Sequence, residues 1–303
     1  MKYAVTGGAG FVGNNIVRLL ISKGHEVVVI DDLHTGKREN LVDVINEIKI
    51  EEIDIRDYEK LKEILMNVDG IFHQAALTIV QESFDKTKEY FDVNVKGTEN
   101  IFKIAKEFSK KVVYASSSSV YGNTVKIPIK ENSDRNPINP YGQTKLEDEL
   151  LAEEYAKEGL SVIGLRYFNI FGRGQTGSYA GVITQFLRKL NQNQQPIIFG
   201  DGSQIRDFIH VSDIAEANLC AMLSETSSGF FNIGTGKGTK IIELAKIMIK
   251  IFEKDFEPIF EDPLKGDVTI SQADTTLTKK MLNWKSKVEL EEGLRSFVRT
   301  DKK

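Results

Sequence analysis

Cysteine is almost absent from this sequence, which contains only Cys220. A single thiol cannot form an internal disulfide or supply a cysteine-based metal site, so we expect a protein of a reducing compartment. The four histidines are scattered without the spacing of a metal-binding motif, and no metal is predicted. Cys220 lies in a helical pattern and is expected to belong to the core.

Long apolar runs and an excess of charge of one sign are also missing. No run approaches the length of a membrane span, and the amino-terminal residues lack the pattern of a signal peptide, so we expect a cytoplasmic protein that binds no membrane. The formal net charge of -4 over 303 residues gives no electrostatic reason to expect nucleic acid. An anionic ligand would therefore need a local basic pocket.

Short apolar segments alternate with amphipathic helical segments through the first half of the chain. Several apolar segments are almost continuously hydrophobic, which is typical of strands buried on both faces of a parallel sheet. The alternation predicts an α/β fold with a Rossmann-type, doubly wound parallel sheet. Strands are predicted at Lys2–Thr6, Glu26–Asp31, Ile48–Ile53, Gly70–His73, Lys111–Ser116 and Ser161–Tyr167. Helices are predicted at Phe11–Lys23, Glu59–Met66, Thr87–Phe108 and Tyr141–Lys157.

The alternation loosens after Tyr167, where segments rich in glycine and asparagine carry shorter elements. We expect a larger cofactor-binding domain of residues 1–167 plus about 212–235. A smaller α/β substrate-binding domain would comprise residues 168–211 and 236–303. Its region and the returning segment contain strands predicted at Pro196–Phe199 and Phe208–Val211, and helices predicted at Ser212–Leu223, Lys240–Phe252, Leu277–Leu282 and Leu290–Thr300.

A glycine-rich turn joins the first predicted strand to the first helix, with Gly7, Gly10 and Gly13 at three-residue spacing. Glycine permits a tight turn and close approach of the backbone to a pyrophosphate, and the helix N-terminus presents free N–H groups to it. Asp31 and Asp32 end the second strand, about twenty residues on. A carboxylate there accepts hydrogen bonds from both ribose hydroxyls and repels a 2′-phosphate, so NAD is favoured over NADP.

Tyr141 and Lys145 form a Tyr-x-x-x-Lys motif at the start of a predicted helix, and this spacing places both on one helix face. A free tyrosine has a pKa near ~10, and a neighbouring ammonium group lowers that value by favouring the phenolate. The pair can then exchange a proton with a sugar hydroxyl. A simple surface pair is the alternative. The serines at 116–119 follow a strand, where open α/β sheets place their chemistry.

Several short motifs occur in order along nearly the whole chain. They read TGGAGFVG, Asp54-Ile55, HQAA, ASSSSVYG, PYGQTK, RYFNIFG, GDGSQIRDFIHVSD and NIGTG. Together they resemble the extended short-chain dehydrogenase/reductase family, and within it the UDP-glucose 4-epimerase group of NDP-sugar enzymes. The resemblance implies an isomerase of nucleotide-sugar metabolism that uses NAD, and a homodimer formed through two of the predicted helices.

By this resemblance, Ser117, Tyr141 and Lys145 form the catalytic triad. Tyr141 removes the proton of the sugar 4-OH, Ser117 hydrogen-bonds the same oxygen, and Lys145 tunes Tyr141 and holds the nicotinamide ribose. Hydride passes from C4 to NAD, the 4-keto sugar turns over, and hydride returns to the opposite face. Besides the three glycines, Tyr141 and Lys145, the cofactor-contacting positions are matched by Phe11, Val12, Asp31, Asp32, Asp54, Ile55, Ala75, Asn94 and Phe168.

The residues after the serine strand discriminate between reactions. Dehydratases of the family resemble a pattern with Asp and Glu where this chain has Ser118 and Ser119, and decarboxylases resemble a version with Glu. A serine hydroxyl is too weak an acid and base to expel water, which favours 4-epimerisation of a UDP-hexose. The alternatives are another NDP-sugar oxidoreductase or epimerase, such as a UDP-glucuronate 4-epimerase, and a non-catalytic NAD-sensing protein.

The nucleotide-sugar end is matched by Asn169, Phe199, Arg206 and Asp267, which the resemblance assigns to the diphosphate, uracil and uridine ribose. A second arginine, usual in the family just before the Gly-Asp pair, is absent, and Lys265 could replace it as a point charge. Ser271 matches a gate beside the sugar C2. Because serine leaves room for an N-acetyl group, UDP-Glc/UDP-Gal and UDP-GlcNAc/UDP-GalNAc both stay open.

Overall fold

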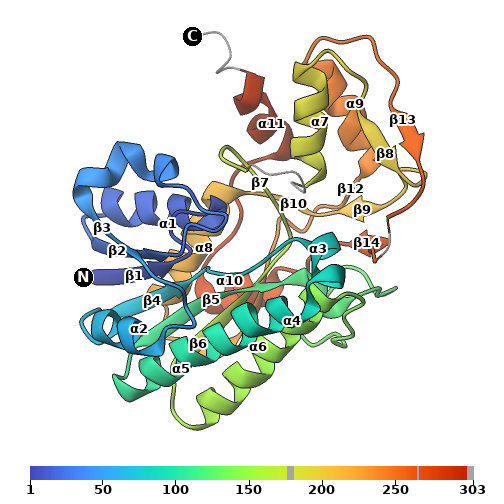
Figure 1. Cartoon of the computed structure of the whole chain (residues 1–303). Helices are drawn as coiled ribbons and strands as arrows, with labels where there is room; N and C mark the ends of the chain where they lie inside the picture. The colour runs from blue at the N-terminus through green and yellow to red at the C-terminus, as the bar shows by residue number, and fades with distance from the viewer. Residues whose placement is uncertain (176–180, 265, 299–303) are drawn as a thin grey trace.

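A seven-stranded parallel sheet forms the larger part of the protein (Figure 1). The computed structural model describes residues 1–175, 181–264 and 266–298. The strand order is β11-β6-β5-β4-β1-β2-β3, so the chain reverses direction across the sheet between β1 and β4. The strands are β1 (Lys2–Thr6), β2 (Glu26–Asp31), β3 (Ile48–Glu52), β4 (Gly70–His73), β5 (Lys111–Ser117), β6 (Val162–Tyr167) and β11 (Ser228–Ile233). The predicted Rossmann-type α/β fold is confirmed.

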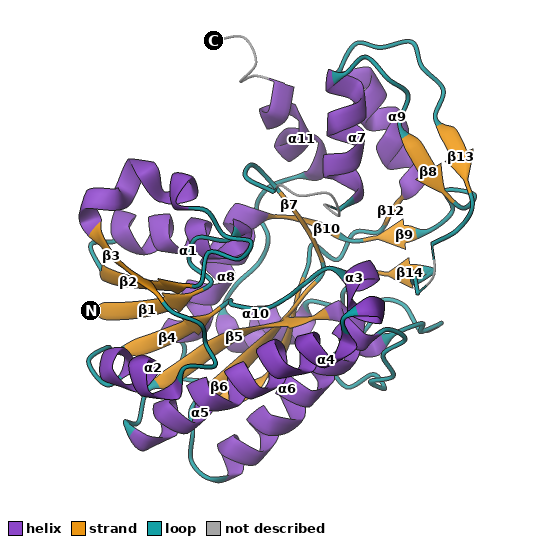
Figure 2. Cartoon of the chain, viewed as in Figure 1, coloured by secondary structure: helices purple, strands orange, loops and turns teal. Residues whose placement is uncertain are grey.

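Helices cover both faces of this sheet (Figure 2). One face packs against α1 (Phe11–Ser22), α8 (Val211–Leu223) and α10 (Thr276–Leu282). The other packs against α2 (Tyr58–Leu65), α5 (Gly97–Glu107) and α6 (Pro140–Lys157). The core therefore lies in two apolar layers, as a doubly wound sheet requires.

The predicted helix Thr87–Phe108 is helical almost throughout, but it is not a single α-helix. It comprises α4 (Thr87–Tyr90), a π-helical turn (Phe91–Lys96) and α5. A short helix, α3 (Val80–Asp85), precedes it, and 3-10 turns occur at Arg38–Glu47 and Ser118–Tyr121. π-helical turns are rare and occur often at functional sites, and this one carries a predicted site residue, Asn94.

The second lobe has a core of its own, formed largely by Phe186, Leu190, Ile198, Leu244 and Met248. Its helices are α7 (Val182–Asn191), α9 (Ile241–Ile251) and α11 (Leu290–Val298). Its strands are β8 (Ile197–Phe199) paired with β13 (Ile259–Glu261), and β9 (Ile205–Arg206) between β12 (Thr239–Lys240) and β14 (Ile270–Ser271). A parallel pair, β7 (Asn169–Phe171) and β10 (Phe208–His210), lies between this lobe and the large sheet (Figure 1).

The separate core supports a division into two domains. The domain boundaries given above stay a proposal. The end of the predicted helix Leu290–Thr300 lies outside the described residues. In the part of the chain that the structure describes, none of the helices has the length and apolar character needed to cross a membrane.

A buried ionic network joins the elements beneath the serine strand. Arg166 on β6 is 2% exposed and donates two hydrogen bonds to the Glu149 carboxylate on α6, at 2.8 and 2.7 Å. The Ser116 hydroxyl on β5 donates to the same carboxylate at 2.6 Å, and Arg166 donates to the Tyr121 hydroxyl at 2.7 Å. The network therefore fixes α6, β5, β6 and the turn after β5 relative to one another.

Replacing Glu149→Gln should destabilise the fold by roughly 3–5 kcal/mol, because Arg166 would keep a buried charge without a full counter-charge. Urea unfolding followed by circular dichroism measures this. The control is Glu291→Gln, which breaks the exposed Glu291–Arg295 pair and should cost less than about 1 kcal/mol. Equal small losses in both variants would contradict this account of the network.

Candidate active site

A cavity of about 1170 Å³ opens at the carboxyl ends of the parallel strands, between the two lobes. Open α/β sheets bind ligands at this edge, next to the point where strand order reverses. The cavity is lined by every predicted site residue except Asn94: Gly7, Gly10, Phe11, Val12, Gly13, Asp31, Asp32, Asp54, Ile55, Ala75, Ser117, Tyr141, Lys145, Phe168, Asn169, Phe199, Arg206, Asp267 and Ser271.

The glycine turn has no room for larger residues at two of its positions. Gly7 has a φ of +65°, and a Cβ there would lie 2.7 Å from the Ala75 nitrogen. A Cβ at Gly13 would lie 2.1 Å from the Gly7 carbonyl oxygen. α1 begins after Gly10 with no capping side chain and no acidic residue in its first turn, which leaves its first N–H groups for an anionic ligand.

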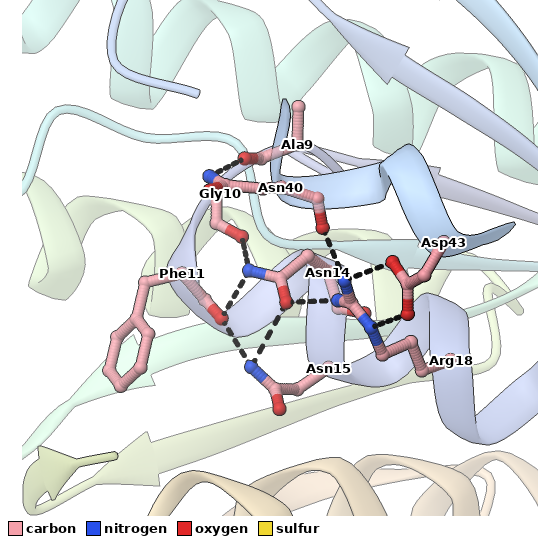
Figure 3. Close-up of polar contacts among 8 residues, drawn as sticks. All are labelled: Ala9, Gly10, Phe11, Asn14, Asn15, Arg18, Asn40 and Asp43. Atoms are coloured by element: carbon pink, nitrogen blue, oxygen red, sulfur yellow. Dashed lines mark hydrogen bonds and ion pairs between the residues drawn. The ribbon is translucent and has the colours of Figure 1, made fainter. Parts of the chain in front are cut away.

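A polar network holds this turn from behind (Figure 3). The Asn14 amide donates to the Gly10 carbonyl at 2.6 Å, and the Asn40 amide donates to the Ala9 carbonyl at 2.8 Å. Arg18 joins the two asparagines: it donates to the Asn14 side-chain oxygen and to the Asn40 carbonyl, both at 2.5 Å, and pairs with Asp43. The backbone of the turn is therefore preorganised before any ligand binds.

Three carboxylates line the cavity at and just after the ends of β2 and β3: Asp31, Asp32 and Asp54. Asp31 is buried, which raises its pKa although the backbone N–H groups of Leu33 and Ala9 bind it. A carboxylate has about four acceptor positions, so Asp31 keeps capacity for ribose hydroxyls. Asp32 lies at the cavity rim, and Asp54 is paired with Arg56 at 2.5 Å. Together with the glycine turn, these residues fit a dinucleotide.

Asn94 is fully buried behind the cavity wall. Its side-chain oxygen accepts a hydrogen bond from the Leu77 N–H at 2.8 Å, and its amide donates to the Leu77 carbonyl at 3.0 Å and to the Thr144 hydroxyl at 3.0 Å. Leu77 lines the cavity. Any influence of Asn94 on a cofactor would therefore pass through the loop that it braces.

The predicted catalytic residues meet at the end of β5 and the start of α6. Asn139 caps α6 by accepting a hydrogen bond from the Gly142 N–H at 2.8 Å, and Pro140 occupies the first helical position. This start directs Tyr141 into the cavity, where its hydroxyl has no hydrogen-bond partner among the described residues. Ser117 lies at the end of β5 and accepts a hydrogen bond from the Ser119 N–H at 3.1 Å.

Lys145 lies one helical turn after Tyr141 and is only 3% exposed. Its ammonium pairs with Asp148 at 3.0 Å. Burial works against a charged lysine, but the neighbouring Asp148, with Tyr141 and Glu149, leaves the pKa of Lys145 above its usual value. The lysine is therefore an ammonium group at neutral pH, as the Tyr-x-x-x-Lys hypothesis requires.

The second lobe supplies the other end of the cavity. Arg206 donates to the Asp267 carboxylate at 2.6 Å, and Ser271 is 4% exposed in the neighbouring strand β14. Leu264 also lines the cavity. Lys265, which was considered as a replacement for the arginine that this chain lacks, lies outside the described residues.

Three residues of the site were missed from the sequence. Arg188 and Lys189 line the cavity from α7, where their adjacent basic pair at the end of an amphipathic helix was the available sign. Asp148 could have been found from its place three residues after Lys145.

Comparison with known proteins decides the family. Residues 3–234 match the family described as the NAD dependent epimerase/dehydratase family. The chain belongs to this family. The predicted resemblance and the NAD cofactor are thereby confirmed, and the residues above fit that cofactor.

Relatives of this epimerase/dehydratase family member span more than one activity. A UDP-glucose 4-epimerase of Thermotoga maritima, solved with UDP-glucose, is 35% identical over the whole of both chains, with a TM-score of 0.95. A UDP-N-acetylglucosamine 4-epimerase of Methanobrevibacter ruminantium, solved with UDP-N-acetylmuramic acid, is 35% identical over 98% of this chain and 97% of that chain, with a TM-score of 0.94. A UDP-N-acetyl-alpha-D-glucosaminuronate decarboxylase of Bacillus cytotoxicus is 34% identical over 97% of this chain and 95% of that protein.

The predicted enzyme class, an isomerase of the UDP-sugar 4-epimerase type, is confirmed by the epimerases among these relatives. The roles of individual residues stay predictions.

Gly13→Ala should weaken NAD binding by about ten- to a hundredfold, because its Cβ would overlap the Gly7 carbonyl and the turn would have to shift by an overpacking cost of about 1–3 kcal/mol. Calorimetric titration of NAD into the stripped protein measures the dissociation constant. Gly181→Ala is the matched control, since that glycine also lines the cavity and, among the described residues, its Cβ would meet the Gln175 amide nitrogen at an ordinary 3.5 Å. An unchanged affinity in Gly13→Ala would remove the turn from the cofactor site.

Proposed function

We propose that this enzyme epimerises a UDP-hexose at C4 through a transient 4-keto sugar, acting on UDP-Glc/UDP-Gal, UDP-GlcNAc/UDP-GalNAc or both pairs. One observation carries the proposal. Tyr141, Lys145 and Ser117 share one cavity with the glycine turn, while the strand end beside them carries serines at 118 and 119. This arrangement supports a proton-transfer pair beside a dinucleotide site, with hydroxyls rather than carboxylates at positions 118 and 119.

Each residue has a distinct task in this proposal. The Tyr141 hydroxyl exchanges a proton with the sugar O4, and the Ser117 hydroxyl hydrogen-bonds the same oxygen. The buried Lys145 ammonium stabilises the Tyr141 phenolate, because opposite charges attract strongly away from water. NAD, when bound, accepts hydride from C4 and returns it. Inversion follows if the keto sugar presents its other face before the hydride returns.

The charged residues of the cavity support epimerisation over elimination. The carboxylates that line the described cavity beyond the cofactor end include Glu82, which accepts hydrogen bonds from Lys86 at 2.8 Å and from the Tyr90 hydroxyl at 3.0 Å. Lys86 holds the pKa of Glu82 below its usual value, so Glu82 is a poor proton donor. Glu82 is therefore poorly suited to the acid role that a dehydratase needs, which favours epimerisation.

A nucleoside diphosphate fits the second lobe. Arg206 offers a planar donor group suited to phosphate, and Phe199 offers an aromatic surface for a base. Lys189 is partly buried, lines the cavity and has no ion pair with a described residue, so it can supply the charge that the absent arginine supplies elsewhere. A UDP-glucuronate 4-epimerase and a non-catalytic NAD sensor stay as alternatives to be tested.

A homodimer stays a proposal as well. Thr98 and Phe102 on α5 are buried inside the chain, whereas Leu150 on α6 is 38% exposed. A dimer through these helices would therefore use α6 residues such as Leu150 more than the α5 stripe.

Incubation with UDP-Glc, UDP-Gal, UDP-GlcNAc, UDP-GalNAc and UDP-GlcA, followed by chromatography, tests the reaction. At least one hexose pair should interconvert, and Tyr141→Phe should reduce turnover by at least about 10²-fold because it removes the acid–base group. The variant should still bind NAD. Full turnover by Tyr141→Phe would exclude the mechanism, and conversion of UDP-GlcA alone would favour the uronate alternative.

Ser271→Tyr tests the sugar selectivity. Ser271 is buried, at 4% exposed, so a phenol ring in its place would take up space beside the sugar. The variant should therefore disfavour N-acetylated sugars relative to UDP-Glc/UDP-Gal by about tenfold or more in kcat/KM. Ser271→Ala is the control for loss of the hydroxyl. If the ratio of the two activities stays the same in Ser271→Tyr, Ser271 does not gate the sugar.

A further inference from the structure

The predicted catalytic lysine is held by a buried carboxylate that has no assigned role. The Lys145 ammonium lies 3.0 Å from an Asp148 carboxylate oxygen, and the two side chains are 4% and 0% exposed. Lys145 lies at the cavity wall, whereas Asp148 does not line the cavity. Asp148 therefore contacts Lys145 from behind, on the side away from any ligand.

The other charged and titratable groups around this pair leave Asp148 as the counter-ion of Lys145. On α6, Glu149 is engaged by Arg166 from β6. On β4, burial together with the charge of Lys145 lowers the pKa of His73 to about 3, so that ring is neutral. On β5, burial and the nearby carboxylates raise the pKa of Tyr114 well above its usual value, so its hydroxyl is neutral. The remaining neighbour is Tyr141, the proposed acid–base group.

Thr98 on α5 acts on Asp148 and is itself linked to the sheet. The Thr98 hydroxyl favours the Asp148 carboxylate form, and it is hydrogen-bonded to His73 at 2.9 Å. His73 is in turn hydrogen-bonded to the Thr6 hydroxyl of β1 at 2.7 Å. A line of hydrogen bonds thus runs from β1 through β4 to Thr98 on α5, in a region otherwise filled with apolar side chains.

We propose that Asp148 is a positioning residue that keeps Lys145 charged and holds its ammonium group beside Tyr141. This inference rests on the proposed function. Without a counter-ion, a buried lysine loses its proton readily, since burial disfavours the charged form. A neutral Lys145 could no longer stabilise a phenolate at Tyr141, and the acid–base pair would fail although both of its members were present.

The electrostatic balance of the pair agrees with this role. Burial raises the pKa of Asp148 to about 6 although Lys145 pulls it down, and the pKa of Lys145 lies above its usual value. Above about pH 6, therefore, Asp148 is ionised and Lys145 is protonated, so the pair is fully formed over the neutral and mildly alkaline range. Removing the carboxylate takes away the nearest charge that opposes burial, and burial lowers the pKa of Lys145.

Asp148→Asn, which keeps the shape and removes the charge, tests the proposal in the NAD-loaded enzyme. The pH dependence of kcat/KM for the sugar pair that the wild-type enzyme converts is the kinetic measurement. The decline at alkaline pH should begin at least about one pH unit lower in the variant, as Lys145 loses its proton earlier. Glu147→Gln is the matched control: it removes a carboxylate from the same helix that binds Gln143 rather than Lys145, and its profile should match the wild type.

Titration of the lysines by NMR with ¹³Cε-labelled lysine provides a second measurement that needs no turnover. The signal assigned through Lys145→Arg should titrate above the usual lysine pKa of about 10.4 in the unaltered protein and at least about one unit lower in Asp148→Asn. If Asp148→Asn does not fold, the titration of the unaltered protein still decides: a Lys145 that loses its proton at or below the usual value overturns the proposal.

The outcomes separate this inference from the proposed function. Asp148→Asn could instead lower activity equally at all pH values, with the same shape of the pH dependence of kcat/KM and the same Lys145 titration. That result would show a merely structural role and overturn the proposal. If Tyr141→Phe retains turnover while Lys145 titrates as expected, the proposed mechanism fails and the charge-holding role of Asp148 stands. If both the lysine titration and the profile shift, the positioning role is supported.

Discussion

Buried charge on one helix is the constraint on which the site depends. α6 packs against the sheet through Lys145, Asp148 and Glu149, none of them more than 3% exposed. A buried charge is tolerated only with a close partner of opposite sign. Glu149 finds Arg166 on β6, and Asp148 finds Lys145 on the same helix. The pairing of Glu149 with Arg166 joins α6 to β6 of the sheet, and Tyr141 at the start of the same helix lines the cavity.

The sequence predicted most of the large sheet because strands buried on both faces leave an almost continuous apolar pattern. Six strands lie within one residue of their predicted bounds. β11 was not predicted as a strand. It lies at the edge of the sheet, its first residue is exposed, and it contains Gly229 and Asn232. The strands of the second lobe are two or three residues long, and β13 is exposed throughout. Two of the short strands, β8 and β10, match the predicted segments Pro196–Phe199 and Phe208–Val211 to within one residue. The other short strands carry no periodicity, and only tertiary pairing reveals them.

The candidate site divides in the same way. The glycine turn and the Tyr-x-x-x-Lys motif could be read locally, because a turn and one helix face each depend on a few neighbouring residues. The pairing of Asp148 with Lys145 could also be read from their spacing of three residues. The burial of Asp148 could not, since a charged residue in a helical pattern is normally assigned to the exposed face. α6 does not follow this pattern, because Lys145, Asp148 and Glu149 occupy buried positions where an amphipathic helix normally has apolar residues. The π-helical turn that carries Asn94 was hidden for a related reason, because side-chain bonds to the Leu77 loop leave no mark on the hydrophobic period.

The distribution of charge also limits what the site can do to a 4-keto sugar. Ammonium and hydroxyl groups lie at the end of β5, while the accessible carboxylates belong to the cofactor end or are engaged by other side chains. A 4-keto sugar held there would accept a proton at O4 as hydride returns. Positions 118 and 119 offer hydroxyls instead of the carboxylates that would remove a proton from C5 and protonate a leaving hydroxyl. A uronic acid oxidised at C4 would be a β-keto acid, which loses CO₂ without needing such groups. A hexose with a neutral CH₂OH group cannot lose CO₂ in this way, which is consistent with the proposed return of hydride to C4.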